Sequence, residues 1–247
     1  NVWQAPPFVD VRDPVDRTED ELIRIVPRNR MHSYSMHRII ELVFDKESFF
    51  EIQPTWGVGM IVGFARLGGH PVGVIANNPS HNAGAPDAKD SRKMGHFTSV
   101  CDQFHIPLIH LVDVPGFMIG EEAERMGTLK DGMSAMCRVM QATVPRISVI
   151  VRKCYGMAGA LNYANHTLHY RIAWPSAEFG SIPIEGGVAA AFRREIEQSP
   201  DPEKRRRELE VEIHTLESPF RTAEKFGVED IIDPRETRYR LYCLIDA

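Results

Sequence analysis

The sequence predicts an α/β protein with a buried sheet, because strand-like apolar runs alternate along the chain with segments of helical periodicity. Residues 107–112 and 146–151 are almost continuously apolar, as expected of strands that are buried on both faces. A helical pattern follows each of these runs. The chain has 247 residues, of which 43% are hydrophobic and 26% are charged, so it can bury a substantial core in one large domain or two small ones.

The amino-terminal part is predicted to lead into the main domain. Several prolines interrupt residues 1–30, which we interpret as a linker. Within this linker, the run from Thr18 to Glu21 has the capping-box pattern and precedes a short apolar segment from Leu22 to Val26. Apolar residues at helical spacing predict a second short helix over Met36 to Phe44.

A hairpin and a helix are predicted next. The strands are expected at residues 58–67 and 71–76, with Gly68-Gly69 as the tight turn between them. Asp90 or Ser91 is then expected to cap a helix. The apolar face of this helix is predicted to consist of Met94, Phe97, Cys101 and Phe104.

The second half continues with helices and strands. After Asp113-Val-Pro-Gly116, a helix is predicted to bury one apolar stripe, which consists of Leu129, Met133, Met136, Cys137 and Met140. Gly156 to Tyr163 is expected to begin a helix, and His169 to Ala173 to form a strand. Further helices are expected over Val188 to Ile196, after the N-cap and N1 pair Asp201-Pro202, and within a closing helical element from Pro219 to Ile245.

The composition excludes several classes of function. A net charge of −5 and a pI near 6.1 provide no basic footprint for nucleic acid. The basic run Lys204 to Arg207 lies among glutamates, which is typical of a solvated helix face. The four cysteines are far apart, which argues against a zinc or redox motif and is typical of a cytosolic protein. No apolar run is long enough to span a bilayer. Because the sequence starts at Asn1 rather than Met, it leaves room for residues upstream.

Familiar catalytic motifs are missing from the sequence. There is no GxSxG elbow, no GxGxxG fingerprint and no phosphate-binding P-loop. The pairs His105 and His110, and His166 and His169, do not have zincin spacing, and we interpret them as structural histidines rather than metal ligands.

Two turns, Asp113 to Phe117 and Tyr155 to Gly159, follow predicted strands, at the edge of an α/β sheet where ligands bind. In the second turn, small residues open a helix whose first amides have no intrahelical acceptor, an arrangement that suits a developing oxyanion. The alternative is a close helix–strand contact that merely needs small residues. Glu178 is either an acid–base group or a hydrogen-bond anchor, and Ile184 to Gly187 is either a loop at the site or a plain turn.

Taken in order, these motifs resemble one family end to end. The chain is similar to the carboxyl-terminal crotonase-like domain of the carboxyltransferase β subunit of biotin-dependent acyl-CoA carboxylases, in particular the propionyl-CoA carboxylase type. The segments that carry the resemblance are Asp13-Pro-Val-Asp-Arg17, Phe49-Phe-Glu-Ile-Gln-Pro54, Val62-Gly-Phe-Ala-Arg66, Val72-Gly-Val-Ile-Ala-Asn77, Cys101-Asp-Gln-Phe104, Val112-Asp-Val-Pro-Gly-Phe117, Arg152-Lys153, Tyr155-Gly156 and Ala173-Trp-Pro175.

The resemblance implies an α/β fold of repeated strand-strand-helix units with a helical carboxyl-terminal extension. It places a lead-in of linker and short helices at residues 1–45 and the biotin-side carboxyltransferase domain at residues 46–247. The implied reaction transfers a carboxyl group from carboxybiotin to the α-carbon of an acyl-CoA. The backbone amides of Met157 and Ala158 are implied as the oxyanion hole for the biotin carbonyl. The implied substrate-binding residues are Gly156, Ala160, Gly116, Phe117 and Tyr155, and the resemblance implies no metal.

The resemblance also implies partners. An amino-terminal carboxyltransferase domain, on this chain or another, would hold the acyl-CoA. A partner with biotin carboxylase and a biotin carboxyl carrier would deliver the cofactor. A hexamer of β subunits in the cytoplasm, or in the mitochondrial matrix of a eukaryote, is expected, without nucleic acid or a membrane span.

Three positions depart from the family pattern. Met157 stands where many members have Gly, Ala160 where relatives often have Asp or a hydrophobic residue, and Asp131 where they often have His. Ala160 predicts a roomier, neutral pocket. The alternatives to a carboxylase are a biotin-dependent decarboxylase or transcarboxylase, a crotonase-type hydratase, and an assembly domain without catalysis.

Overall fold

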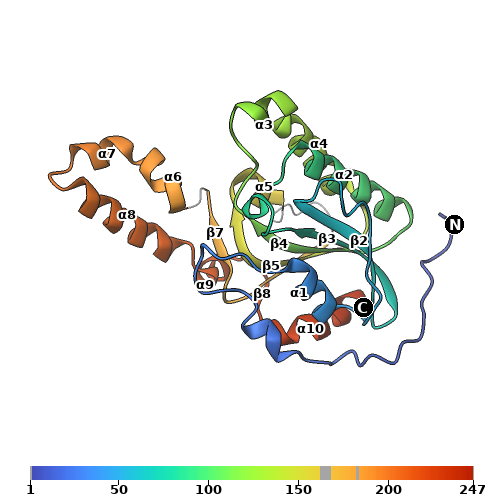
Figure 1. The fold of residues 1–247 in the computed structure, drawn as a ribbon. Helices are drawn as coiled ribbons and strands as arrows, with labels where there is room; N and C mark the ends of the chain where they lie inside the picture. The colour runs from blue at the N-terminus through green and yellow to red at the C-terminus, as the bar shows by residue number, and fades with distance from the viewer. Residues whose placement is uncertain (1, 162–167, 182–183, 247) are drawn as a thin grey trace.

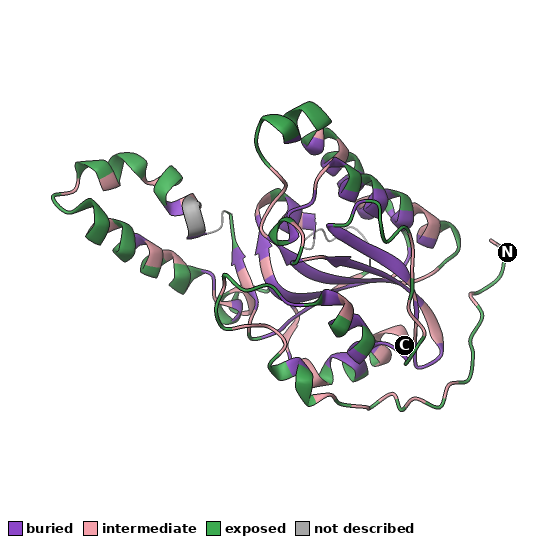
Figure 2. Cartoon of the chain, viewed as in Figure 1, coloured by how far each residue is buried: buried purple, intermediate pink, exposed green. Residues whose placement is uncertain are grey.

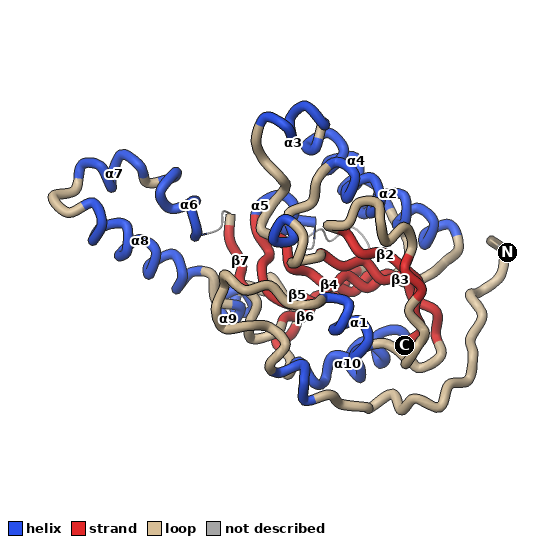
Figure 3. The backbone as a smooth tube through the Cα atoms, in the orientation of Figure 1, coloured by secondary structure: helices blue, strands red, loops and turns tan. Residues whose placement is uncertain are grey.

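A mixed sheet with helices on both faces forms the body of the protein. The structure is a computed structural model, and it describes residues 2–161, 168–181 and 184–246. Helices α1 and α10 pack on one face of the sheet, and α2 and α4 on the other (Figures 1 and 3). The strand order is β1-β2-β3-β4-β5-β6-β8, and β7 pairs with the end of β5. The first three strands are antiparallel, and the remaining pairs are parallel.

The elements have the following bounds. The strands are β1 (Phe50–Glu51), β2 (Met60–Leu67), β3 (His70–Asn77), β4 (Leu108–Val114), β5 (Arg146–Tyr155), β6 (His169–Ala173), β7 (Glu178–Gly180) and β8 (Asp230–Ile231). The α-helices are α1 (Met36–Val43), α2 (Ala88–Gln103), α3 (Glu121–Met126), α4 (Thr128–Gln141), α5 (Gly156–Ala160), α6 (Ile184–Ala191), α7 (Arg193–Gln198), α8 (Pro202–Leu216), α9 (Pro219–Glu224) and α10 (Thr237–Ile245). Short 3-10 turns cover Asp20–Ile23, Asn82–Gly84 and Pro234–Glu236.

The predicted hairpin is confirmed. β2 and β3 pair antiparallel along their whole length, from Met60 opposite Asn77 to Leu67 opposite His70. The buried carboxylate of Asp45 accepts hydrogen bonds from the turn amides of Gly68 and Gly69, at 3.0 and 2.9 Å. The Asp45 side chain thus stabilises the turn of the hairpin.

The strands alternate between two cores, so the sheet is buried on both faces (Figure 2). On β4, Ile109 and Leu111 face α1 and α10, whereas Leu108 faces α2 and α4. Helix α1 is amphipathic, as its spacing predicts, and its apolar residues belong to the first of these cores. Every residue of β4 is buried, which agrees with its nearly continuous apolar sequence.

The beginning of α2 differs from the prediction. Asp87, rather than Asp90 or Ser91, is the N-cap, and it accepts hydrogen bonds from the amides of Lys89 and Asp90. Asp90 is the third residue of the helix and completes the capping box, because its carboxylate accepts a hydrogen bond from the Asp87 amide at 3.0 Å. Phe104 follows the end of the helix and is 39% exposed, so it does not belong to the buried face.

The apolar stripe predicted for α4 is wrong except at Met136. Leu129, Met133 and Cys137 are exposed, and Met140 is only half-buried. The side of α4 that packs on α2 includes the smaller residues Ala135 and Val139, and Gly132 packs against the ring of Phe117. The two helices approach closely there, because an ideal Cβ on Gly95 of α2 would lie 3.1 Å from the Cα of Ala135. Close approach selects small side chains, and the bulky ones are turned outward.

Other segments also differ in detail. The capping box at Thr18 does not form, because Glu21 pairs with Arg38 at 2.7 Å instead of returning to the backbone. The helix expected over Val188 to Ile196 is divided between α6 and α7. The closing element is not purely helical, since β8 lies between α9 and α10 and extends the sheet beside β6.

Other predictions are confirmed. Asp201 caps α8 and Pro202 is its first residue. The strand β6 has the predicted bounds, and the two buried strands are longer than predicted, so that Asp113 lies inside β4 and Arg152 inside β5. The helix after Tyr155 is described as far as its fifth residue, and Tyr163 lies outside the described residues.

Helices α6 to α8 project from the body as an arm (Figure 1). Its small core consists of Ile184, Val188 and Leu209, with Phe192 and Ile196 packed against them. In the part of the chain that the structure describes, no helix has both the length and the apolar composition that crossing a bilayer requires.

Candidate functional site

The turn between β5 and α5 brings main chain to the sheet edge where ligands are expected. Tyr155 ends the strand in an extended conformation, and Gly156 has a φ of +59°, a conformation that favours glycine. Gly159 packs directly on the strand, because an ideal Cβ there would lie 2.7 Å from the carbonyl carbon of Cys154. Both interpretations of this turn are therefore compatible with the geometry: small residues allow a close helix–strand contact, and the contact holds the carboxyl end of α5 against the strand.

The amides at the start of α5 are open. Those of Met157 and Ala158 belong to the first turn, and neither donates to an acceptor among the described residues. The side chain of Met157 is 53% exposed, whereas Ala158 is buried. The bulk of Met157 therefore points away from the packed side of the helix.

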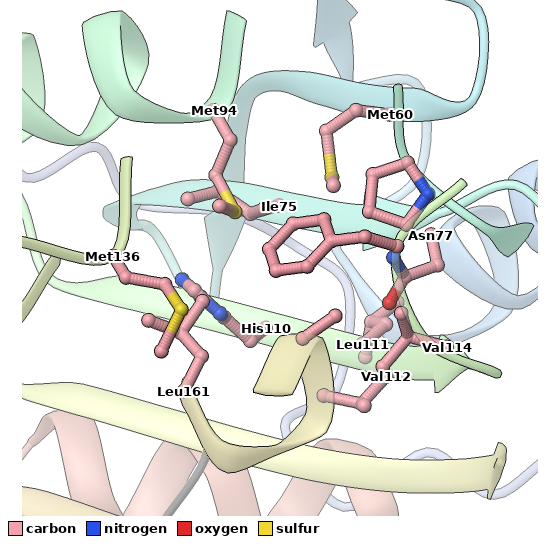
Figure 4. Close-up of a pocket in the computed structure, with 13 residues that line it drawn as sticks. Met60, Ile75, Asn77, Met94, His110, Leu111, Val112, Val114, Met136 and Leu161 are labelled. Atoms are coloured by element: carbon pink, nitrogen blue, oxygen red, sulfur yellow. The ribbon is translucent and has the colours of Figure 1, made fainter. Parts of the chain in front are cut away.

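A small cavity lies beneath α5 (Figure 4). Its volume is about 30 Å³, roughly the space of one water molecule. Three methionines, Met60, Met94 and Met136, contribute to its wall together with Phe117 and Ala158. The remaining lining residues are Ile75, Asn77, Pro86, His110, Leu111, Val112, Val114 and Leu161.

His110 is a buried, ionisable residue in the wall of this cavity. Its ring lies among the side chains of Met136 and Leu161 (Figure 4), and its Nε2 has no hydrogen-bond partner among the described residues. Burial, and then the nearby charges of Arg146 and His169, hold the pKa of His110 well below its ordinary value. The imidazole is therefore neutral at physiological pH. His105 is exposed and binds the carbonyl of Val2, so the two histidines do not act together.

The residues predicted for the site are brought together only in part. Phe117 and Ala158 meet in the wall of the cavity, and Gly156 and Met157 precede Ala158 on the same turn. Gly116 precedes Phe117, and an ideal Cβ there would touch nothing within 4 Å. Ala160 is half-buried at the end of α5.

Tyr155 is fully buried, and its hydroxyl points into a polar cluster rather than toward the open amides. His166 lies outside the described residues, and His169 binds Ser148 and Arg146. In the described residues, no group of three His, Cys, Asp or Glu side chains is placed to hold a metal ion.

A charged network behind the turn was not identified from the sequence. Asp113 is fully buried and accepts hydrogen bonds from the Tyr34 hydroxyl at 2.8 Å, from Arg152 Nε at 3.2 Å and from the Lys153 amide at 3.1 Å. Arg152 also donates to the carbonyl of His32 and lies over the ring of Tyr34. The carboxylate thereby locks the end of β5 to β4 and to the lead-in. The available signal was an acid directly after one apolar strand and an arginine directly after the next.

A second cluster, which we call the clasp, consists of Arg30, Tyr155, Glu178 and Glu217. Arg30 pairs with Glu178 at 2.9 Å and lies 3.6 Å from Glu217. The Tyr155 hydroxyl donates to Glu178 at 3.2 Å and accepts from Arg30 at 3.1 Å. Glu178 is thus an anchor in this structure, which answers one of the alternatives left open by the sequence.

Glu217 is the member of the clasp whose carboxylate is buried without a hydrogen bond from the described residues. Its side chain is 3% exposed, and neither carboxylate oxygen has a hydrogen-bond partner within the described residues. Burial raises the pKa of Glu217, and the neighbouring charge of Glu178 adds to this, whereas Tyr155, Arg30 and His214 oppose it. Burial also raises the pKa of Tyr155, so its hydroxyl remains a donor.

Replacing Glu217 by Gln is expected to stabilise the protein at neutral pH. A carboxyl with a raised pKa favours folding at pH values below its unfolded pKa and loses that contribution as the pH rises through the folded pKa. The isosteric amide removes the ionised form, and we expect a gain of about 1 kcal/mol above the raised pKa that shrinks to nothing in acid. Thermal melts at pH values from about 4 to about 8 measure this difference in stability, because that range includes both ordinary and raised carboxyl pKa values.

The matched control is Glu178→Gln, which breaks the 2.9 Å ion pair with Arg30 and should lower stability at neutral pH. A Glu217→Gln variant that is as strongly destabilised as the control would contradict the prediction.

The comparisons with known proteins agree with this geometry. The family model described as "carboxyl transferase domain" matches residues 1–247. The carboxyltransferase subunit of propionyl-CoA carboxylase from Haloferax mediterranei is 39% identical over 98% of this chain and 47% of its own length. The mitochondrial propionyl-CoA carboxylase beta chain of Homo sapiens is 37% identical over 98% of this chain and 44% of its own. The chain thus spans about half the length of these relatives.

Solved structures give the same result. A transcarboxylase 12S structure with methylmalonyl-coenzyme A and methylmalonic acid bound superposes with a TM-score of 0.91 at 32% identity, over 100% of this chain and 48% of that one. A single-chain, multi-domain long-chain acyl-CoA carboxylase superposes with a TM-score of 0.83 at 30% identity, over 96% of this chain and 23% of that one. The resemblance and the crotonase-like α/β fold predicted from the sequence are confirmed. The chain belongs to the carboxyl transferase domain family.

Proposed function

We propose that this chain is the biotin-side half of an acyl-CoA carboxyltransferase. The observation that carries the proposal is the pair of open amides, Met157 and Ala158, at the start of α5 in a chain that matches the carboxyl transferase family from end to end. A carbonyl oxygen that accepts from both amides would carry its negative charge at the positive end of the helix. The donors fit a ureido carbonyl, which needs hydrogen-bond donors and no metal.

The residues of this chain orient and polarise rather than react. Carboxybiotin, when bound, supplies the activated carboxyl group that is transferred. The amides of Met157 and Ala158 would hold the carbonyl oxygen of bound biotin and stabilise negative charge on it. Phe117 and Ala158 line the small cavity on the packed side of the turn.

An exposed apolar surface supports that second domain. On α4, the side chains of Leu129 and Met133 are 57% and 38% exposed and lie one helical turn apart. Ile119, just before α3, is 87% exposed. Exposed groups of large apolar side chains mark protein interfaces. The partner we propose is an amino-terminal carboxyltransferase domain that carries the acyl-CoA, because the relatives are about twice as long as this chain.

The remaining partners follow from the relatives. The transcarboxylase 12S structure is described as a hexamer, and a curated beta5 subunit from Mycobacterium tuberculosis is described as biotin-dependent. We propose an oligomer of this kind, served by a biotin carboxyl carrier and biotin carboxylase in the cytoplasm or the mitochondrial matrix. The propionyl-CoA carboxylases among the relatives favour a short acyl-CoA. Ala160 leaves the pocket neutral at the position that the family resemblance associates with acyl specificity.

A transcarboxylase is the second candidate, because of the TM-score of 0.91 to transcarboxylase 12S. The same amides would hold biotin in either direction of transfer. Carboxylation and transcarboxylation differ in the reaction that recharges biotin: a biotin carboxylase does so in the first, and a second carboxylated donor does so in the other.

Carboxyl exchange on the assembled, full-length protein tests the proposal. Free biotin with malonyl-CoA or methylmalonyl-CoA should become carboxylated, and the acyl-CoA should lose its carboxyl group only when biotin is present. With the biotin carboxylase and the carrier present, a carboxylase should recharge biotin from ATP and bicarbonate, whereas a transcarboxylase should need a second carboxylated donor. The absence of exchange across several acyl-CoAs would contradict the proposal and favour an assembly role.

A further inference from the structure

Four segments that are far apart in the sequence meet at the clasp. Arg30 comes from the lead-in, Tyr155 from the end of β5, Glu178 from β7, and Glu217 from the residue that ends α8. The arm, the lead-in and the sheet therefore touch through one set of charged side chains. Glu217 is also tied to β7 by the main chain, because the amide of Phe179 donates to its carbonyl at 3.0 Å.

Tyr155 connects the clasp to the proposed site. It is the residue directly before Gly156, and its side chain is fully buried. Its Cα pairs with Gly180 of β7, and the carbonyl of Ser181, the next residue, lies 3.3 Å from an ideal Cβ on Gly156. A shift of Tyr155 would therefore press Gly156 at the start of α5 against the Ser181 carbonyl.

The opposite end of α5 is fixed independently. Gly159 rests on the main chain of Cys154, so the helix cannot slide toward the strand. With that end held, the orientation of the first turn depends on where Tyr155 lies. The Tyr155 hydroxyl has two charged partners, Arg30 and Glu178, and the Glu217 carboxylate lies 3.6 Å from Arg30.

We propose that Tyr155 is a positioning residue for the amides of Met157 and Ala158, and that the clasp holds its hydroxyl in place. This rests on the proposed function of those amides. Hydrogen bonds to charged groups are stronger than neutral ones, so the hydroxyl is a firm anchor. Arg30 is shared between two carboxylates, and it keeps them from repelling each other beneath the turn. The position of the arm is thereby coupled to the site, because Glu217 ends α8.

The test uses Tyr155→Phe and Arg30→Met in the assembled, full-length protein. Tyr155→Phe keeps the packed ring and removes only the hydroxyl. In both variants we expect deuterium uptake in the peptide 152–161 to become about five- to tenfold faster. This is the factor expected for the loss of one hydrogen bond to a charged partner. In the exchange assay, kcat should fall about tenfold because the amides are misplaced, whereas the KM for acyl-CoA should stay within about twofold. Arg30→Lys should restore part of both effects.

The matched control is Tyr170→Phe on the neighbouring strand β6, in the core that contains α1. Its uptake and kcat should match the wild type. Unchanged uptake at residues 152–161 in both clasp variants would overturn the proposal, and so would an equal acceleration in α10, which would indicate general loosening. If the wild type shows no carboxyl exchange, the proposed function fails, and the uptake still decides whether the clasp positions the turn.

Discussion

Asp113→Ala should be the most destabilising single substitution at the back of the site. The carboxylate is fully buried and pairs with Arg152, whose side chain is 6% exposed, at 3.1 Å. Without this carboxylate, the buried Arg152 guanidinium loses its charge partner, and the Tyr34 hydroxyl and the Lys153 amide lose their acceptor. Removing one partner of a buried ion pair costs about 3–5 kcal/mol. Urea denaturation, read as the free energy of unfolding, measures the loss.

Two further variants sharpen this prediction. The double variant Asp113→Leu, Arg152→Met removes both charges, and it should lose less stability than Asp113→Ala because no buried charge is left alone. Asp233→Ala breaks a half-exposed pair with Arg235, with an expected cost of at most about 1 kcal/mol. If Asp113→Ala lost no more than the Asp233 variant, the network would not stabilise the fold as described.

Ala158→Pro should abolish most of the carboxyl exchange. Proline removes the amide that we assign to the biotin carbonyl, while the first turn of a helix tolerates its ring. Losing one oxyanion donor lowers kcat by about 10²- to 10³-fold. The readout is biotin-dependent decarboxylation of malonyl-CoA by the assembled protein, together with its melting temperature.

Ala158→Gly is the matched control for that substitution. It keeps the amide and deletes only a methyl group from the cavity wall, so most of the exchange activity should remain. A stably folded Ala158→Pro protein with wild-type kcat would show that this amide is not a donor to the reacting group. An ester in place of the 157–158 peptide bond removes the donor without proline's constraint and should give the same loss.

Local signals predicted the backbone of the fold well. The run His169 to Ala173 became β6 with the same bounds, and Asp201-Pro202 opens α8 as its cap and first residue. Such elements are decided by periodicity and capping, which neighbouring residues carry. The stripe on α4 failed because a tertiary contact, the close approach of α2, selected the small residues for burial. Hydrophobicity alone cannot foresee which face another helix will touch.

The site shows the same division. The turn at Gly156 to Gly159 was found from its small residues, and the family resemblance assigned its amides to a ligand. The clasp could not be found in this way, because Arg30, Glu178 and Glu217 come from three distant segments and each is an ordinary surface type in the sequence. The orientation of Tyr155 was also hidden, since its position in the motif does not reveal which side of the strand its hydroxyl takes.

The arm departs from the sheet and returns to nearly the same place. It leaves after β7, and at its far end the Glu217 carbonyl accepts a hydrogen bond from the Phe179 amide, within β7 itself. Its own core of Ile184, Val188 and Leu209 belongs to no other cluster. The arm is an insertion that contributes no strand to the sheet, and a hydrogen bond already joins the two ends of the arm. A change in the length of this segment would therefore leave the register of the strands that carry the site unchanged.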